Sequence, residues 1–208
     1  MPTETLETIA TDVRACRKCR LFERATHGVP GEGSPSAEIM FIGEGPGFHE
    51  DQQGRPFVGA AGRLLDEMLE LVGMRRADVF ITNVVRHRPP DNRDPLQDEL
   101  DACDEYTLRQ IAVLQPRLIV TLGRYSMARF FGPGARISRI HGETTTWRGI
   151  TCVAMYHPAA VLRAQSPAMR QAYEQDFRKI PALLAEVRAR PEAPPPPDQG
   201  RVDQLPLF

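Results

Sequence analysis

The sequence predicts an α/β protein built on a mostly parallel β-sheet that helices cover on both faces. Three short apolar runs, residues 38–42, 78–85 and 117–122, alternate with segments whose apolar residues recur at helical spacing. Strands that are apolar along their whole length are typical of parallel sheets buried on both sides. The chain has 208 residues, of which 41% are hydrophobic and 25% charged, values ordinary for a globular domain with an extension.

The first half of the chain supplies strand, loop and helix twice. Strand 38–42 runs into a glycine-rich loop, and residues 57–72 then carry apolar side chains at helical spacing, namely Leu64, Leu65, Met68, Leu69 and Val72. The second strand, 78–85, leads through a proline-rich loop to a helix over 96–114 that has Pro95 at its start.

The second half of the chain departs from this alternation. Strand 117–122 is followed by a short helix, but residues 143–147 and 150–156 predict a hairpin, because only an Arg-Gly pair separates them. A last helix over 169–188 contains Pro181, which predicts a kink or break there.

Composition divides the chain into a domain, residues 1–190, and a tail, residues 191–208. The tail holds six of the 19 prolines and few apolar residues, so we expect it to be flexible and partly extended. It carries three acidic residues and one arginine, a charge of −2, which leaves about +1 on the domain, since the whole chain has −1. Any attraction to nucleic acid must therefore come from a local patch of arginines.

The N-terminal segment and the cysteine count bear on location. Glu4, Glu7 and Asp12 interrupt the N-terminal segment without an apolar block, which argues against a secretory signal, and no apolar run reaches the ~18 residues of a membrane span. We expect a cytoplasmic, nucleoid-associated monomer without membrane contact. Four cysteines in that compartment indicate free thiols or a metal site rather than disulfides.

A glycine-rich segment, Gly43-Glu44-Gly45-Pro46-Gly47, follows the first strand directly. It lacks the GxGxxG order of a dinucleotide site and the Gly-Lys-Ser/Thr ending of a phosphate-binding loop, so neither motif is present. A glutamate in a loop built for close backbone approach would repel phosphate, but it can hold a water molecule or polarise a neutral ring. An incidental glutamate in a strand-to-helix turn is the alternative.

Polar residues also end two other strands. Asn83 lies near the end of the second strand, and His157 follows the last strand, with Pro158 favouring a helix that begins at the histidine. Ligands of open parallel sheets bind at the carboxyl edge. We therefore expect Glu44, Asn83 and His157 to converge there, although a single histidine is more often structural.

The cysteines suggest a metal centre. Cys16 and Cys19 form a C-x2-C pair, which lets two thiolates bind one metal or cluster. Cys152 lies in an apolar strand and is interpreted as a buried small hydrophobe, so Cys103 and His87 complete the candidate ligand set. Three cysteines and one histidine suit structural zinc as well as iron-sulfur, and spacing does not separate the two.

The loop after the second strand is rich in arginine. Arg86, Arg88 and Arg93 lie within eight residues and are the candidate contacts to a DNA backbone. A solvated surface loop is the commoner reading of scattered arginines.

Taken together, these segments resemble the family 4 uracil-DNA glycosylases, the iron-sulfur branch of the uracil-DNA glycosylase superfamily. The resemblance covers about residues 13 to 185 and rests on six motifs in order: Cys16-x-x-Cys19, Gly43 to Gly47 with Glu50-Asp51, Gly54 to Gly59, Thr82 to Val85, Arg88-Pro-Pro-x-Asn-Arg93, and His157-Pro158-Ala159. It implies a three-layer α/β/α sandwich and an enzyme that flips uracil out of DNA, hydrolyses its N-glycosidic bond and so initiates base-excision repair.

The resemblance also assigns roles to the matching residues. Phe57 would stack on the flipped uracil, and Asn83 would bond its Watson-Crick edge and so separate uracil from cytosine. His157 would stabilise negative charge on the uracil O2. Glu44, with the backbone around Gly45 and Gly43, would position the attacking water or stabilise the sugar cation.

A histidine stands where this family has a cluster cysteine. Fifteen residues separate His87 from Cys103, which matches the usual gap between the third and fourth ligands. The resemblance therefore implies a [4Fe-4S] cluster held by Cys16, Cys19, Cys103 and His87. A neutral imidazole in place of a thiolate would raise the cluster potential.

The end of the tail resembles the QLxLF peptide by which bacterial DNA enzymes bind the replication sliding clamp. Gln204 would be the polar anchor, Leu205, Leu207 and Phe208 would fill an apolar pocket, and the proline-rich segment would supply reach. The alternative is a tail that folds back on the domain.

Two rival functions remain from the sequence. One is a zinc-held nucleic-acid-binding module, and the other is a protein that traps uracil-DNA covalently without turnover. The covalent branch carries an inserted basic loop with a reactive histidine after its second-strand motif. Here that position holds only the short loop 88–95, and His141 lies elsewhere. We therefore predict ordinary hydrolytic turnover.

Overall fold

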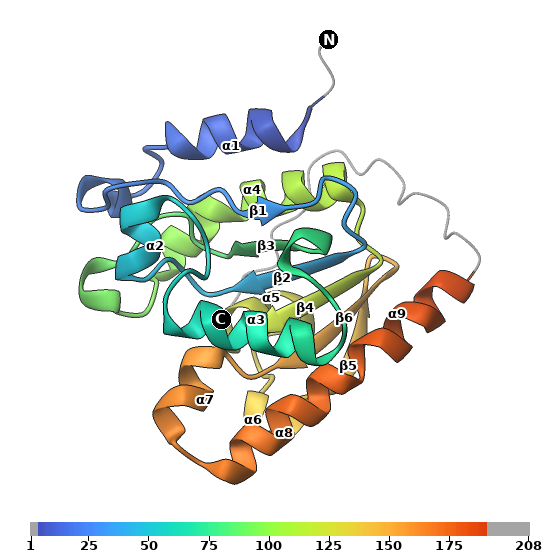
Figure 1. Cartoon of the computed structure of the whole chain (residues 1–208). Coiled ribbons are helices and arrows are strands. Elements are labelled where there is room, and N and C mark those ends of the chain that lie inside the picture. Colours follow the sequence, from blue (N-terminus) through green and yellow to red (C-terminus); the bar gives the residue numbers. More distant parts are fainter. Residues whose placement is uncertain (1–3, 191–208) are drawn as a thin grey trace.

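A computed structural model describes residues 4–190 of the chain. One six-stranded sheet with the order β1-β3-β2-β4-β6-β5 forms its centre (Figure 1). Its strands are β1 (Glu32–Gly33), β2 (Ile39–Gly43), β3 (Phe80–Asn83), β4 (Leu118–Leu122), β5 (Thr144–Trp147) and β6 (Ile150–Met155). The predicted tail, residues 191–208, lies outside the described residues, and with it the four residues expected to bind a clamp.

Helices surround the sheet. They are α1 (Leu6–Arg14), α2 (Phe48–Gln53), α3 (Ala60–Leu71), α4 (Gln97–Leu114), α5 (Arg124–Phe131), α6 (Ile137–Ile140), α7 (Pro158–Ala164), α8 (Pro167–Arg178) and α9 (Ile180–Ala189). Three 3-10 turns, Arg20–Glu23, Arg76–Asp78 and Pro90–Asn92, connect them. No helix within residues 4–190 has the length and apolar character that crossing a membrane requires.

The four inner strands β3, β2, β4 and β6 run parallel, and only the short outer strands β1 and β5 are antiparallel to their neighbours. The prediction of a mostly parallel sheet is confirmed. The register pairs Gly43 with Asn83, and Leu122 with Met155. The carboxyl ends of all four strands therefore meet at one edge.

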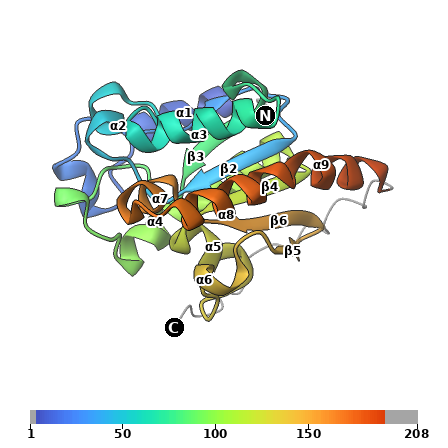
Figure 2. The same ribbon diagram turned by 60° about the horizontal axis from the view of Figure 1, so that its bottom comes forward.

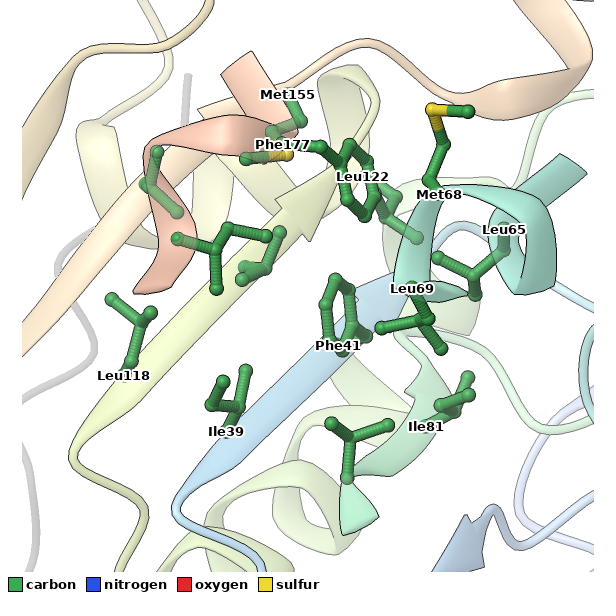
Figure 3. Close-up of a cluster of buried hydrophobic side chains, with 14 of the residues drawn as sticks. Ile39, Phe41, Leu65, Met68, Leu69, Ile81, Leu118, Leu122, Met155 and Phe177 are labelled. Carbon is green, nitrogen blue, oxygen red and sulfur yellow. The ribbon is translucent and has the colours of Figure 1, made fainter. Parts of the chain in front are cut away.

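Successive side chains along a strand point to opposite faces, and each face has its own core. Phe41 and Ile81 point toward α3, α8 and α9, where they pack with Leu65, Met68 and Phe177 (Figure 3). Met40 and Ile119 point the other way and pack with apolar residues of α4 and α5. Figure 2 shows the sheet between these two helical layers, which confirms the predicted three-layer sandwich.

The last predicted helix is broken, as expected, but two residues before its proline. α8 ends at Arg178 and α9 begins at Ile180, so Pro181 occupies the first turn of α9. Proline is tolerated there because an N–H in the first turn has no partner within the helix.

Three helices were not expected, namely α1, α2 and the four-residue α6. α1 begins after Thr5, whose side chain caps it, and buries Ile9 and Val13 against Tyr106 of α4. α2 is a short helix inside a segment that reads as loop, because the glycines on either side of it hide its pattern.

Candidate active site

Three strand ends carry the predicted polar residues at one edge of the sheet (Figure 1). Gly43 ends β2 and pairs with Asn83, which ends β3, while Glu44 continues from β2. His157 follows β6 and is the N-cap of α7. Glu44, Asn83 and His157, the three residues expected to converge, thus all lie at the carboxyl edge. Asn83 also lies against Gly43 and Phe57, since a Cβ on Gly43 would be 2.5 Å from both Asn83 Oδ1 and Phe57 Cζ. Only glycine allows these three residues to meet.

Phe57 lies in the loop between α2 and α3, with its ring 5% exposed. The ring stacks on His157 with 5.7 Å between centroids and 26° between planes. Its backbone has a φ of 51°, a left-handed conformation that is strained for a bulky residue. Such strain persists only where the surroundings fix the backbone.

Glu50 fixes this backbone. Its Oε1 accepts hydrogen bonds from the N–H groups of Val58 (2.9 Å) and Gly59 (2.8 Å), and its Oε2 accepts one from Gly47 (3.1 Å). Arg76 Nη1 donates to the carbonyl of Phe57 at 3.1 Å. One carboxylate thus ties the glycine-rich loop to the Phe57 loop.

His157 is held as a neutral imidazole of defined tautomer. Burial lowers its pKa to about 4, with the positive charge of Arg163 acting in the same direction. Its Nδ1 accepts a hydrogen bond from the N–H of Ala159 at 3.1 Å. An acceptor nitrogen carries no proton, so the proton lies on Nε2, which is a donor.

Glu44 is half-buried beside the same edge. Burial raises its pKa, and the negative charge of Asp94 adds to this, while Arg124 and Arg163 act in the opposite direction. Its carbonyl accepts a hydrogen bond from the N–H of Val85 at 3.1 Å, which fixes the backbone of the glycine-rich loop against the chain after β3.

Asn83 presents an unpaired amide. The residue is 2% exposed, and its Oδ1 is buried without a hydrogen-bond partner. A buried polar atom without a partner is costly unless a ligand supplies one. The Asn83 amide oxygen is therefore free to accept a hydrogen bond from a ligand in this site.

The candidate metal ligands gather on the opposite side of β3, under the N-terminal arm, but they do not converge on a point. Cys103 donates a hydrogen bond to Cys19, which lowers the pKa of Cys19 to about 7. Cys16 and His87 line one cavity of about 310 Å³. Within residues 4–190, no three His, Cys, Asp or Glu side chains are placed to hold a single metal ion. Cys152 is fully buried in β6, away from this group, as expected.

The three arginines of the loop after β3 have three different surroundings. Arg86 is 0% exposed, so its expected contact with a DNA backbone is wrong: a side chain sealed in the interior does not reach phosphate. Arg93 forms a two-pronged ion pair with Glu99, at 2.6 and 2.8 Å. Arg88 bonds Asn92 and lies over the ring of Phe48, which is 54% exposed.

Comparison with known proteins agrees with this geometry. The model of the uracil DNA glycosylase superfamily matches residues 30–178. The chain belongs to this superfamily. It is 48% identical over 189 residues to a type-4 uracil-DNA glycosylase of Sulfurisphaera tokodaii, covering 86% of this chain and 85% of that one. Identity is 46% over 191 residues to the type-4 enzyme of Archaeoglobus fulgidus (88% and 95% covered) and 40% over 184 residues to that of Thermotoga maritima (87% and 95%).

The superfamily match contains every residue of the edge site. Cys16 and Cys19 precede residue 30, so the N-terminal arm falls outside the match, although the alignments with the relatives cover 86–88% of the chain. Together with the fold, the match establishes the chain as a DNA glycosylase of the uracil DNA glycosylase superfamily.

Sequence reasoning missed two residues near the site of this glycosylase, Glu50 and Asp51, and gave a third, Arg86, the wrong surroundings. Glu50 and Asp51 were noted only as part of a motif, yet Glu50 braces the Phe57 loop and buried Asp51 accepts hydrogen bonds from the N–H groups of Thr26 (2.8 Å) and His27 (3.3 Å). The available signal for Glu50 was its place three residues after Gly47, where a carboxylate caps a helix. Nothing local signals the burial of Arg86.

Proposed function

We infer that this chain is a uracil-DNA glycosylase, which binds a uracil flipped out of DNA and hydrolyses the bond between its N1 and the deoxyribose. The observation that carries this inference is the pairing of an unpartnered, buried amide on Asn83 with the neutral His157 at the same sheet edge. Uracil offers an edge of N3–H and O4 to an amide, and an O2 that becomes negative as the bond breaks.

Recognition rests on three residues. Phe57 supplies an aromatic face on which a pyrimidine stacks, and the amide of Asn83 both donates and accepts, which matches N3–H and O4 of uracil. Cytosine has an acceptor at N3 and a donor at N4, so the same amide orientation is mismatched. Gly43 allows Asn83 and Phe57 to lie close to it, because the side chain of any larger residue would displace both of them.

Catalysis rests on His157 and Glu44. As the N-glycosidic bond breaks, its electron pair passes to uracil, and Nε2–H of His157 donates to the negative O2. A neutral donor gains most when that charge appears, so it favours the transition state over the ground state. The Glu44 carboxylate opposes the positive sugar and orients the water that attacks C1′, with the backbone of Gly45 lining the same loop.

Release of uracil tests these roles. His157→Ala removes one donor to the leaving group and should lower kcat about 100- to 1,000-fold. Glu44→Ala should lower it about 100-fold or more. The measurement is free uracil released from a uracil-containing oligonucleotide, with Glu70→Ala, an exposed acidic residue of α3, as control. Full activity in both variants would contradict the assignment.

Turnover in the same assay separates an enzyme from a covalent trap. His141 Nδ1 donates a hydrogen bond to Asp176 Oδ2 at 2.6 Å, and its ring centroid lies 4.8 Å from that of Tyr156. His141 is thus engaged within the protein, and the short loop 88–95 holds no histidine, so we propose hydrolytic turnover. Excess substrate should yield many uracil molecules per protein chain, whereas a trap would stop at one.

A [4Fe-4S] cluster is proposed for the cysteine corner. Two placements support the proposal: Cys19 lies beside Cys103, and Cys16 and His87 line one cavity. In a cluster each ligand binds a different iron, so Cys16, Cys19, Cys103 and His87 would each supply one bond. Burial lowers the pKa of His87, which keeps its imidazole neutral and able to bind metal. When bound, the cluster would join the N-terminal arm to α4 and to the loop after β3.

For the DNA backbone we propose Arg88. In contrast to Arg93, it has no carboxylate within ion-pair distance among the described residues. Its guanidinium lies over the ring of Phe48 at the start of α2, on the same edge as the uracil site. This placement leaves it available to phosphate beside the flipped nucleotide.

The tail is proposed to bind the sliding clamp through Gln204, Leu205, Leu207 and Phe208. The proposal rests on the sequence alone. Deleting residues 204–208 should abolish co-elution with the clamp and leave excision from a short oligonucleotide unchanged. Alanine substitutions at Leu207 and Phe208 provide the matched test of the apolar anchor. Unaltered clamp binding by both variants would refute it.

A further inference from the structure

Arg86 is among the largest fully buried side chains of the protein. Burial lowers its pKa to about 10, so the guanidinium remains charged at neutral pH. Buried charges are normally paired with an opposite charge. No carboxylate in residues 4–190 lies within ion-pair distance of Arg86. A buried cation without a carboxylate needs a reason to be present.

Every acceptor that Arg86 uses is uncharged. Nη1 donates to Thr82 Oγ1 and to the main-chain carbonyl of Asn83, and Nη2 donates to Thr107 Oγ1 and Gln110 Oε1, both at 3.0 Å. The first two belong to the end of β3, and the last two belong to α4. The guanidinium is therefore a rigid link between the strand that carries the uracil-reading amide and the helix packed behind it.

The link extends to the chain before β1. Gln110 Nε2 donates to the carbonyl of Pro30 at 2.5 Å, and Thr82 Oγ1 donates to the same oxygen at 3.3 Å. Gln110 and Thr82, both bonded to Arg86, are thus themselves held by one carbonyl. Four oxygens from two segments, β3 and α4, surround one planar group, and the chain before β1 holds two of them in place, which leaves the guanidinium little freedom to move.

The hydrogen bond from Arg86 to Asn83 lies at the point where β3 ends. Asn83 is the last residue of β3, and the next N–H, of Val84, turns to the carbonyl of Gly43. Buried Arg86 holds the main-chain carbonyl of Asn83, while the side-chain amide of the same residue lies against Gly43 and Phe57. Fixing this peptide fixes the direction in which the amide leaves the backbone.

We propose that Arg86 is a positioning residue for uracil recognition, which holds the main chain of Asn83 from the protein interior so that the Asn83 amide meets the base edge. The inference rests on the proposed role of Asn83. The planar guanidinium suits the task, because Nη1 and Nη2 together donate to a carbonyl and three side-chain oxygens at once, while the buried Nε has no partner among residues 4–190. A displacement of about 1 Å at a recognition group can lower activity about 100-fold.

The test uses the full chain and two readouts, namely kcat and KM for excision of uracil from DNA, and inhibition by free uracil. Free uracil reports on the base site without DNA contacts. Arg86→Met should weaken inhibition by free uracil about 10- to 100-fold and lower kcat/KM to a similar extent. Arg86→Lys should recover part of both, since an ammonium still donates to the Asn83 carbonyl.

A matched pair of milder variants separates positioning from stability. Thr107→Val removes one acceptor of Arg86 without touching Asn83, and should weaken uracil inhibition about threefold or more. Thr121→Val makes the same change at another fully buried threonine, whose hydroxyl donates to the carbonyl of Val153 at 3.2 Å, outside this network. Thr121→Val should lose about as much thermal stability as Thr107→Val but leave inhibition by free uracil unchanged.

The outcomes distinguish a failure of the role inferred for Arg86 from a failure of the role proposed for Asn83. If Asn83→Ala leaves uracil inhibition intact, the role of Asn83 itself fails. If Asn83→Ala abolishes inhibition but Arg86→Lys and Thr107→Val, compared at equal iron content, match the unsubstituted chain, the inference about Arg86 is overturned. Should Arg86→Met not fold, Arg86→Lys and Thr107→Val decide alone.

Discussion

At the scale of single residues, the site depends on charge states that burial sets. His157 is neutral because its surroundings disfavour the imidazolium, and Glu44 is harder to ionise than a free glutamate for the same reason. The proposed chemistry needs neutral His157 and ionised Glu44 together. Acidification removes both conditions, since it protonates the carboxylate and the imidazole.

The acid limb of the profile of activity against pH follows from the directions in which the pKa values of Glu44 and His157 are shifted. As pH falls, Glu44 gains its proton first, because its pKa lies above the usual 4.5, and His157 follows near its pKa of about 4. Activity should therefore decline before pH 4.5 is reached. Glu44→Gln should lower the rate at neutral pH about 100-fold and shift the remaining acid limb down toward pH 4.

Measuring kcat/KM for uracil release between neutral pH and the point of acid unfolding checks this. Glu70→Gln, which alters an exposed carboxylate, should keep the original limb. An unchanged limb in Glu44→Gln would mean that another group controls it.

Residue-level prediction of position was confirmed where a polar residue lies at a strand end, whereas the roles of these residues stay predictions. Glu44, Asn83 and His157 were found from their positions after apolar runs, and the structure places them at one edge. Arg86 was misplaced, because sequence-adjacent arginines look alike. Its burial is decided by Thr107 and Gln110, which lie more than 20 residues away.

At the scale of elements, the Phe57 loop is held in a strained conformation by its neighbours. Besides Glu50, it needs Gly62 in the first turns of α3, since a Cβ there would lie 1.8 Å from the carbonyl of Phe57. α3 can begin where it does only because this position has no side chain. The helix and the loop are thus one structural unit.

Gly62→Ala tests this unit, because its effect on stability should be opposite in sign to that of an ordinary glycine-to-alanine substitution inside a helix. Alanine in place of glycine inside a helix normally stabilises by about 1 kcal/mol. Here the methyl group meets a backbone carbonyl, so we expect a loss of about 2 kcal/mol and reduced uracil excision as Phe57 shifts.

Thermal unfolding and excision rate are the measurements. Gly134→Ala is the matched control: nothing lies within 4 Å of its Cβ, and it should change stability by less than about 0.5 kcal/mol. A Gly62→Ala variant more stable than the unsubstituted chain would show that the Phe57 loop moves aside at little cost in free energy.

At the scale of the whole molecule, the proposed cluster would join segments that the sheet does not. The N-terminal arm with Cys16 and Cys19 packs on α4, which carries Cys103, and His87 lies in the loop after β3. The proposed uracil site and the proposed iron site are thus joined through a few residues after β3.

Substitution of His87 tests the ligand set. His87→Cys restores a thiolate and should keep or strengthen the cluster, whereas His87→Ala should lose iron. The potential of His87→Cys should be lower than that of the unsubstituted chain, since a thiolate replaces a neutral imidazole. Iron content and visible absorbance of the purified chain are the measurements.

Cys152→Ala controls for the loss of a buried cysteine that is not a proposed ligand, and should keep its iron. If His87→Ala retains the full iron content together with uracil release, His87 is not a ligand. Zinc in place of iron would overturn the proposed cluster itself.

The sequence by itself determined the layers of this protein and the strand ends that carry its chemistry. Apolar runs with period-two or helical spacing reflect burial on one or both faces, and burial is a local property of each element. Tertiary structure alone decided which side chains are sealed and which backbone is strained. Arg86 is enclosed by α4, and Phe57 is held by Glu50 and by the absence of a side chain at Gly62. Such contacts join residues that no local pattern relates, because packing places them together only after the chain has folded.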